Sequence, residues 1–148
     1  MKGVILLVED NPDDEELTLL AMRENGLGGM VTVARDGEEA LDYLWGRGQY
    51  SGRDTTDQPL LVLLDINLPK LSGIEVLAAM RADARTQCVP VVMLTTSAVD
   101  SDLTASYSKG ANSYLVKPVD FGEFLELVSQ LKRYWLGLNR VPSVCAAD

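Results

Sequence analysis

Residues 4–14 read VILLVEDNPDD, a continuous run of aliphatic side chains that stops at a pair of acidic residues. Strands that helices cover on both faces need such continuous runs, whereas half-exposed strands alternate apolar and polar residues. Three more apolar runs and one weaker run occur along the chain, at residues 60–64, 89–94, 114–116 and, for the weaker one, 30–34. The sequence therefore predicts five strands in a parallel sheet.

The segments between these runs have helical spacing and recognisable ends. Asn11 is placed to cap a helix that begins at Pro12, and Ser72 with Glu75 has the pattern of a capping box. Asp120 is placed to open the last helix. Strand and helix thus alternate five times, which predicts an α/β fold: a five-stranded parallel sheet in flavodoxin-like order 2-1-3-4-5 with five flanking helices.

The length of 148 residues is typical of one domain. Residues 46–59 are rich in glycine, aspartate and threonine, and we interpret them as a loop inserted before the third strand. We find no repeat and no second domain. The predicted organisation is one domain over residues 1–136 and a C-terminal tail over residues 137–148.

Charge and composition exclude several classes of function. The net charge of -9 argues against binding to nucleic-acid backbones and to anionic membranes. The chain has no histidine, so histidine-based catalysis is excluded. Two cysteines, Cys88 and Cys145, are too few for a disulfide framework, and no signal peptide or membrane span is visible. We therefore expect a cytoplasmic protein, with Cys88 as a buried thiol.

Polar side chains directly follow four of the predicted strands. Glu9 and Asp10 follow the first strand, Asp65 the third, Thr95 the fourth and Lys117 the fifth. Ligands of open α/β sheets bind outside the carboxyl ends of the strands, where the strand order reverses. In the predicted order this point lies between the first and third strands, so we expect these five side chains to converge there.

The residue types in this constellation suit phosphoryl chemistry. Three neighbouring carboxylates, Glu9, Asp10 and Asp65, need a compensating cation, and Mg²⁺ prefers such oxygen ligands. The backbone carbonyl of Asn67 is placed to add one more oxygen. Lys117 offers a positive charge to a phosphoryl oxygen, and Asp65 is the natural nucleophile for an acyl phosphate. Transfer of this kind needs positioning and charge neutralisation more than acid–base groups.

Four motifs together resemble the receiver domains of two-component response regulators. They are EDN at 9–11, DINLP at 65–69 with Gly73, LTTS at 94–97 and YLVKP at 114–118. The resemblance covers residues 3–135, in order and at family spacing apart from the insertion. It identifies residues 1–136 as a receiver domain.

The resemblance implies a role for each site residue. Asp65 matches the phosphoacceptor, and Glu9 and Asp10 match the acidic pair that holds Mg²⁺. Thr95 and Tyr114 match the switch residues that respond to the phosphoryl group. Lys117 matches the family lysine, followed by a cis peptide bond at Pro118. Positions 67 and 97 tune the rate of phosphoryl loss in the family.

A narrower resemblance is to stand-alone receivers paired with bacterial phytochromes. It rests on NPDD at 11–14, KPVD at 117–120 and YWL at 134–136. It implies a sensor histidine kinase, a bacteriophytochrome, as partner, and a homodimer. Output would pass to a downstream protein or phosphotransfer partner, without direct binding to DNA or to a membrane.

Alternative interpretations stay open. A haloacid-dehalogenase-like phosphatase also uses a strand-end aspartate with Mg²⁺, but on its first strand and with a second aspartate two residues later; here position 67 is asparagine. A pseudo-receiver would keep the fold without phosphorylation. Tyr134 and Trp135 suit either a helix core or a dimer surface. In the receiver interpretation the chain is not an enzyme with turnover.

Overall fold

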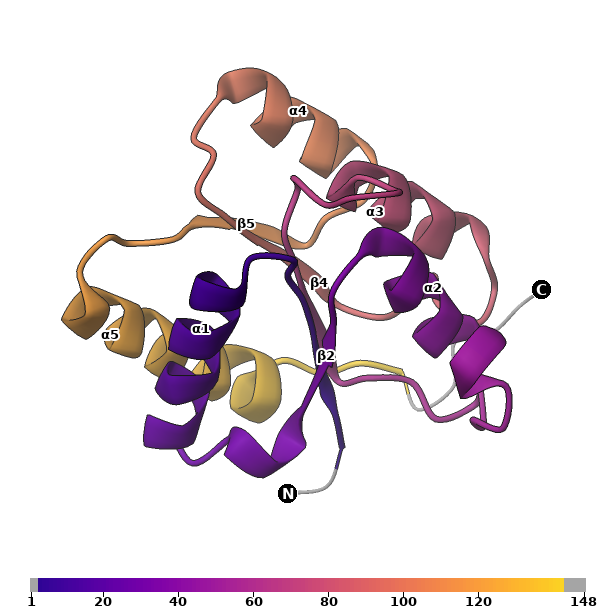
Figure 1. Ribbon diagram of the computed structural model, residues 1–148, viewed down its shortest axis with the longest axis horizontal. Helices are drawn as coiled ribbons and strands as arrows, with labels where there is room; N and C mark the ends of the chain where they lie inside the picture. Colours follow the sequence, from indigo (N-terminus) through magenta and orange to yellow (C-terminus); the bar gives the residue numbers. More distant parts are fainter. Residues whose placement is uncertain (1–2, 143–148) are drawn as a thin grey trace.

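Five strands form one parallel sheet in the order β2-β1-β3-β4-β5. The computed structural model describes residues 3–142 (Figure 1). Its strands are β1 (Ile5–Val8), β2 (Val31–Ala34), β3 (Leu61–Leu64), β4 (Val91–Thr95) and β5 (Ser113–Val116). The predicted fold class and strand order are confirmed.

Helices cover both faces of this sheet (Figure 1). They are α1 (Pro12–Glu24), α2 (Gly37–Trp45), α3 (Gly73–Ala82), α4 (Asp100–Ser108) and α5 (Phe121–Leu131), with short 3-10 turns at Gly28–Met30 and Gly48–Tyr50. Helices α1 and α5 pack together on one face, and α2 and α3 pack together on the other. Helix α4 contacts α3 and β5.

Alternate side chains of each strand enter two separate cores. On β1, Leu6 and Val8 pack with residues of α2 and α3, whereas Ile5 and Leu7 pack with residues of α1 and α5. All four side chains are buried. This two-sided burial is the reason that the strands are continuous apolar runs in the sequence.

Three of the predicted helix starts are confirmed by their hydrogen bonds. The Asn11 side chain accepts from the N–H groups of residues 13 and 14, and the Asp120 side chain accepts from that of residue 123. Ser72 and Glu75 form a reciprocal capping box at α3. Helix α4 is different, because its N-cap residue, Val99, has no side chain that can accept a hydrogen bond.

Helix α3 begins in close contact with the segment that follows β3. The N–H of Gly73 donates to the carbonyl of Ile66 at 2.7 Å. A Cβ atom added to Gly73 would lie 1.9 Å from the carbonyl oxygen of Asp65. Only glycine permits this approach, so position 73 fixes where the backbone of Asp65 lies.

The insertion at residues 46–59 is anchored to α2. The guanidinium of Arg53 lies 4.1 Å from the ring centroid of Tyr43 and donates to the Tyr43 carbonyl at 2.6 Å. The Gln58 amide donates to the carbonyls of Leu44 and Thr55. The insertion is therefore a loop, as predicted, with hydrogen bonds that hold it to the domain.

Two features of the chain after α3 differ from expectation. Helical backbone continues beyond α5 as a π-helix at Lys132–Leu138, which includes the first two residues of the predicted tail. Cys88 is exposed and disulfide-bonded, so the prediction of a buried thiol is wrong. It lies in the connection from α3 to β4, which runs over the surface as connections usually do. Cys145 lies outside the described residues.

Candidate functional site

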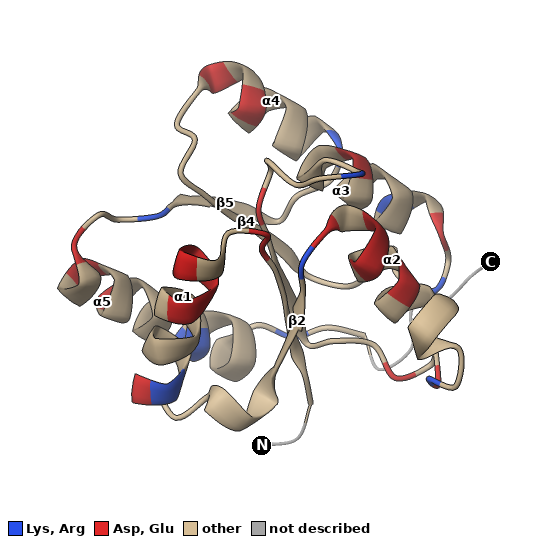
Figure 2. Cartoon of the chain, in the orientation of Figure 1, with Lys and Arg blue, Asp and Glu red and all other residues tan. Residues whose placement is uncertain are grey.

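Three carboxylates meet at the carboxyl end of the sheet. Strands β1 and β3 are neighbours in register, with Val8 opposite Leu64, so the residues that follow them emerge side by side. These are Glu9 and Asp10 after β1 and Asp65 after β3, and each offers one oxygen within 4.8 Å of the others. Figure 2 shows this acidic colour at the ends of the central strands, beside the acidic first turn of α1.

The ammonium group of Lys117 faces this cluster from the segment after β5. It forms an ion pair with the carboxylate of Glu9, and it lies 3.6 Å from Asp65 Oδ2 and 3.4 Å from Asp14 Oδ2. The Lys117 N–H donates to the carbonyl of Thr95 at 2.8 Å, which fixes the backbone from which the side chain extends. The Lys117 and Glu9 side chains are almost fully buried.

Burial and charge shift the pKa values of this pair. Burial raises the pKa of Glu9, the Lys117 ammonium works against it, and the Asp65 charge adds to it, so that the pKa is about 7. For Lys117, burial favours the neutral form, but the hydrogen bond to Glu9 and the charges of Asp65, Glu9 and Asp14 outweigh it, so its pKa is raised. Lys117 is therefore a permanent cation at neutral pH.

This set of donors fits a hard divalent cation. Carboxylate oxygens are the ligands that such ions prefer, and Mg²⁺ keeps water molecules beside one or two of them. Glu9 and Asp65 are buried, whereas Asp10 is exposed, so the cluster is open to solvent on the side of Asp10. The single ammonium of Lys117 does not balance three carboxylates, which leaves a net negative charge for a cation to neutralise.

The two predicted switch residues meet at Ser97 rather than at each other. Thr95, at the end of β4, is fully buried, and its Oγ1 accepts a hydrogen bond from the Ser97 N–H at 3.3 Å. The Tyr114 hydroxyl donates to the Ser97 carbonyl at 2.9 Å. The loop after β4 therefore links the two side chains.

Two further features of the predicted site have different outcomes. The side chain of Asn67, two residues beyond Asp65, is exposed, and its backbone carbonyl stays a predicted metal ligand. The peptide bond between Lys117 and Pro118 is trans, so the predicted cis bond is wrong. Trans is the preferred form of X-Pro bonds, and the trans backbone already brings Lys117 to Glu9 and Asp65.

Asp14 is a member of the site that the sequence analysis missed. In the sequence analysis it is used only as part of the NPDD motif at residues 11–14, and its negative charge is favourable in the first turn of α1. The cap at Asn11 places Asp14 in the first turn of α1, directly after the acidic pair, and this turn brings it to Lys117. No local spacing signals this contact, because Lys117 lies far from Asp14 in the sequence.

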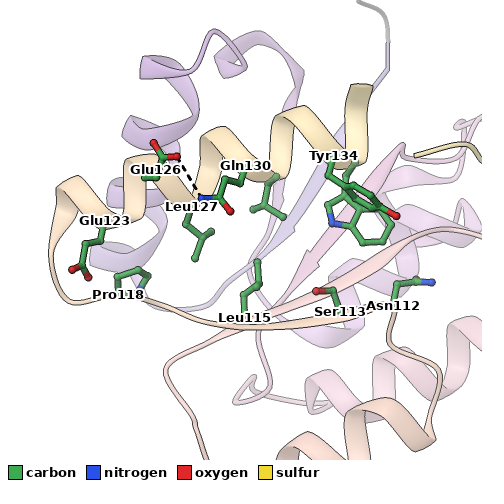
Figure 3. Close-up of a pocket in the computed structure, with 11 residues that line it drawn as sticks. Asn112, Ser113, Leu115, Pro118, Glu123, Glu126, Leu127, Gln130 and Tyr134 are labelled. Carbon is green, nitrogen blue, oxygen red and sulfur yellow. Dashed lines mark hydrogen bonds between the residues drawn. The ribbon is translucent and has the colours of Figure 1, made fainter. Parts of the chain in front are cut away.

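A second candidate site lies between β5 and α5. It is a groove of about 640 Å³, and Figure 3 shows Leu115, Leu127 and Tyr134 among the side chains along it. Trp135 also lines it, with its ring 5.0 Å from that of Tyr134 in an edge-to-face contact. The carboxylate cluster does not open into this groove.

The response regulator receiver domain family matches residues 5–129, and the chain belongs to this family. The parallel sheet in the order 2-1-3-4-5, with its acidic cluster, is thus the receiver fold of two-component signalling. Between residues 3 and 142 no helix has the length and apolar character to span a membrane.

Three relatives show which members of the family are similar. The "Probable methanogenesis regulatory protein FilR2" of Methanothrix harundinacea is 45% identical, over 94% of this chain and 87% of its own. Response regulator Rcp1 of Synechocystis sp. is 35% identical, over 95% and 93%, and the structure of its Mn²⁺-bound form superposes with a TM-score of 0.84. The phosphorylated cyanobacterial phytochrome response regulator RcpA is 35% identical, over 96% and 99%, with a TM-score of 0.87.

Proposed function

We propose that Asp65 accepts a phosphoryl group from a phosphohistidine of a sensor histidine kinase, in a reaction that depends on Mg²⁺. The observation that carries this proposal is the convergence of Glu9, Asp10, Asp65 and Lys117 at the switch point of the sheet. A buried carboxylate there, in contact with a buried ammonium, is suited to bind a phosphoryl group.

The transfer exchanges one bond to phosphorus for another. A carboxylate oxygen of Asp65 forms a bond to phosphorus while the bond to the kinase histidine breaks, and the electron pair returns to the imidazole. Glu9, Asp10 and Asp65, with the Asn67 carbonyl, would hold the metal ion. The bound Mg²⁺ supplies positive charge to the phosphoryl oxygens.

The remaining polar residues act on the phosphoryl group once it is attached. Lys117 neutralises one of its oxygens, for which its raised pKa keeps it charged. Thr95 donates its hydroxyl to another, and Tyr114 responds through the loop that it shares with Thr95. This changes the surface formed by α4, β5 and α5, a two-state response to a local charge.

Neither alternative fits this site as well. A dehalogenase-like phosphatase would carry its nucleophile after the first strand, with a second aspartate two residues later, whereas here Asp65 follows the third strand, β3, and position 67 is asparagine. A pseudo-receiver would not need the buried pair of Glu9 and Lys117. We therefore infer a phosphoacceptor with self-directed transfer and autodephosphorylation, and not an enzyme that turns over a separate substrate.

An adduct experiment tests the phosphoacceptor. The protein is incubated with Mg²⁺ and either acetyl phosphate or beryllofluoride, followed by intact mass and Trp fluorescence. We expect one phosphoryl adduct on the wild type, none without Mg²⁺, and none on Asp65→Asn. The matched control is Asp57→Asn, in the exposed insertion, which should form the adduct as the wild type does.

Two results would overturn the proposal. A wild type that forms no adduct would support the pseudo-receiver, and an adduct that persists in Asp65→Asn would place the acceptor elsewhere. Sustained hydrolysis of unrelated phosphomonoesters would instead support the phosphatase.

For the partner, we propose a bacteriophytochrome kinase. The similarity to RcpA, a phytochrome response regulator by its description, supports this choice, whereas FilR2, at higher sequence identity, is described as a probable methanogenesis regulatory protein. To test this partner, the rate of phosphotransfer to the protein from a red-light kinase is compared with the rate from an unrelated histidine kinase. The proposal expects faster transfer from the red-light kinase. We also propose a cytoplasmic location. Disulfides are rare in the cytoplasm and Cys88 is disulfide-bonded, so cell fractionation is the test of this location.

We propose that residues 1–136 form the receiver domain, with a tail at 137–148, and that output passes through protein contacts without binding to DNA or membranes.

We further propose that the protein forms a homodimer. The groove between β5 and α5, with its apolar and aromatic lining from Leu127, Tyr134 and Trp135, supports the dimer. Light scattering at tens of micromolar should give twice the mass of one chain. A single-chain mass with and without beryllofluoride would contradict the dimer.

A further inference from the structure

Ser97 is the centre of a hydrogen-bond network between β4, α4 and β5. Its N–H donates to Thr95 Oγ1 at 3.3 Å, and its carbonyl accepts from the Tyr114 hydroxyl at 2.9 Å. Its own hydroxyl donates to Asp102 Oδ2 at 2.6 Å. Both predicted switch residues are therefore bonded to the backbone of one residue, whose side chain is bonded to α4.

We propose that Asp102 is a positioning residue for the phosphoryl response, because it holds Ser97, and through Ser97 restrains the side chains of Thr95 and Tyr114. The proposal rests on the proposed function, since it concerns how readily Thr95 turns toward a phosphoryl group on Asp65. Asp102 itself touches neither the carboxylate cluster nor its lysine.

The bond between Ser97 and Asp102 has a second role at the start of α4. The N-cap residue Val99 has no side-chain acceptor, but its N–H donates to Ser97 Oγ at 3.3 Å. Asp102 lies in the first turn of α4, where a negative charge is favourable. Ser97 therefore replaces the missing side-chain cap at Val99, and Asp102 holds Ser97 to the first turn of α4. These bonds join the first turn of α4 and the loop after β4 into one unit.

The bonds of this unit oppose the rotation of the Thr95 side chain toward Asp65. Thr95 Oγ1 is already the acceptor for the Ser97 N–H, so a Thr95 side chain that turns to Asp65 must leave this bond or carry Ser97 with it. In the second case Ser97 shifts against α4 and the charge-assisted bond to Asp102 is strained. Removing that bond favours the phosphoryl-bound arrangement, because a two-state equilibrium follows the difference in contacts between its states.

The experiment is a double-mutant cycle on the affinity for beryllofluoride in the presence of Mg²⁺, with Ser97→Ala, Asp102→Ala and the double variant. We expect Asp102→Ala to bind beryllofluoride about fivefold more tightly than the wild type, the size expected for one hydrogen bond. The Asp102→Ala change should have much less effect in the Ser97→Ala background, because the two residues share the bond. The matched control is Asp100→Ala, which removes an exposed charge from the same turn of α4 and should leave the affinity unchanged.

The outcomes separate this inference from the proposed function. If the wild type binds no beryllofluoride, the phosphoacceptor itself is wrong. If the wild type binds but Asp102→Ala equals Asp100→Ala, or binds more weakly, the positioning role is wrong and Asp102 only stabilises α4. Urea unfolding measures that stability separately, and full additivity of the two substitutions would also contradict the shared bond.

Discussion

Replacing Gly73 with alanine should lower the free energy of unfolding by at least about 3 kcal/mol and weaken beryllofluoride binding at the same time. The added Cβ would lie 1.9 Å from the carbonyl oxygen of Asp65 and 2.9 Å from the Cα of Ile66. Overpacking costs about 1–3 kcal/mol where side chains can adjust, and here the obstacle is backbone. The start of α3 or the segment after β3 must move, and Asp65 moves with it.

Urea unfolding and beryllofluoride titration of Gly73→Ala measure the two effects. The matched control is Gly52→Ala, at a surface position where an added Cβ meets nothing within 4 Å. This control should be within about 0.5 kcal/mol of the wild type. Equal stability of the two variants would mean that α3 can shift freely, and that Gly73 does not fix the position of Asp65.

Replacing Lys117 with methionine should destabilise the protein by about 3 kcal/mol at pH 8 without divalent cations. The substitution leaves Glu9, which is 1% exposed, as a buried carboxylate without its cation, beside the Asp65 carboxylate. Breaking a buried ion pair at one partner typically costs about 3–5 kcal/mol. Added Mg²⁺ should restore part of this loss, because it supplies positive charge to the same carboxylates.

The loss should shrink as the pH falls, for a reason that already operates in the wild type. The pKa of Glu9 is raised from 4.5 to about 7 in the folded protein, so the folded state holds its proton more tightly than the unfolded state does. Ionisation of Glu9 therefore lowers the free energy of unfolding. This loss is absent below about pH 4.5 and grows as the pH rises to about 7. Lys117→Met removes the ammonium that lowers this pKa, which extends the window to higher pH.

Urea unfolding between pH 5.5 and 8 measures this dependence. The free energy of unfolding should fall more steeply with pH in Lys117→Met than in the wild type. The part of this fall that comes from Glu9 should be absent in Glu9→Gln. The matched control is Lys70→Met, which removes an exposed lysine 3.4 Å from Asp36 and should cost less than about 1 kcal/mol at any of these pH values. A pH-independent loss in Lys117→Met would show that packing, and not the charge of Glu9, is responsible.

Much of the fold follows from the sequence because burial is two-sided here. The central strands β1 and β3 are buried and apolar at every position, and the runs around Ile5–Val8 and Leu61–Leu64 are therefore visible without a structure. The helix starts at Asn11 and Ser72 were predictable because capping is local chemistry. The carboxylate cluster was predictable because parallel strands deliver the residues after them to one edge.

The parts that were missed depend on contacts between distant segments. Asp14 joins the site only because α1 packs beside the segment that carries Lys117. The network of Ser97 requires three elements to meet, and neither Asp102 nor Tyr114 has a spacing that predicts it. The trans bond before Pro118 differs from the family expectation, and no local pattern in the sequence distinguishes the two isomers.

The anchored insertion at residues 46–59 is a suitable place to attach a probe. It enters β3 from the amino end of the sheet, so its tip at Gly52 lies at the end opposite the carboxylates and the switch residues. Arg53 and Gln58 hold the loop to α2, while a Cβ atom added at Gly52 meets nothing within 4 Å. A fluorophore, an affinity tag or a surface linker attached at Gly52 would leave the carboxyl face free for a kinase, and would give biosensor builders a fixed point from which to observe it.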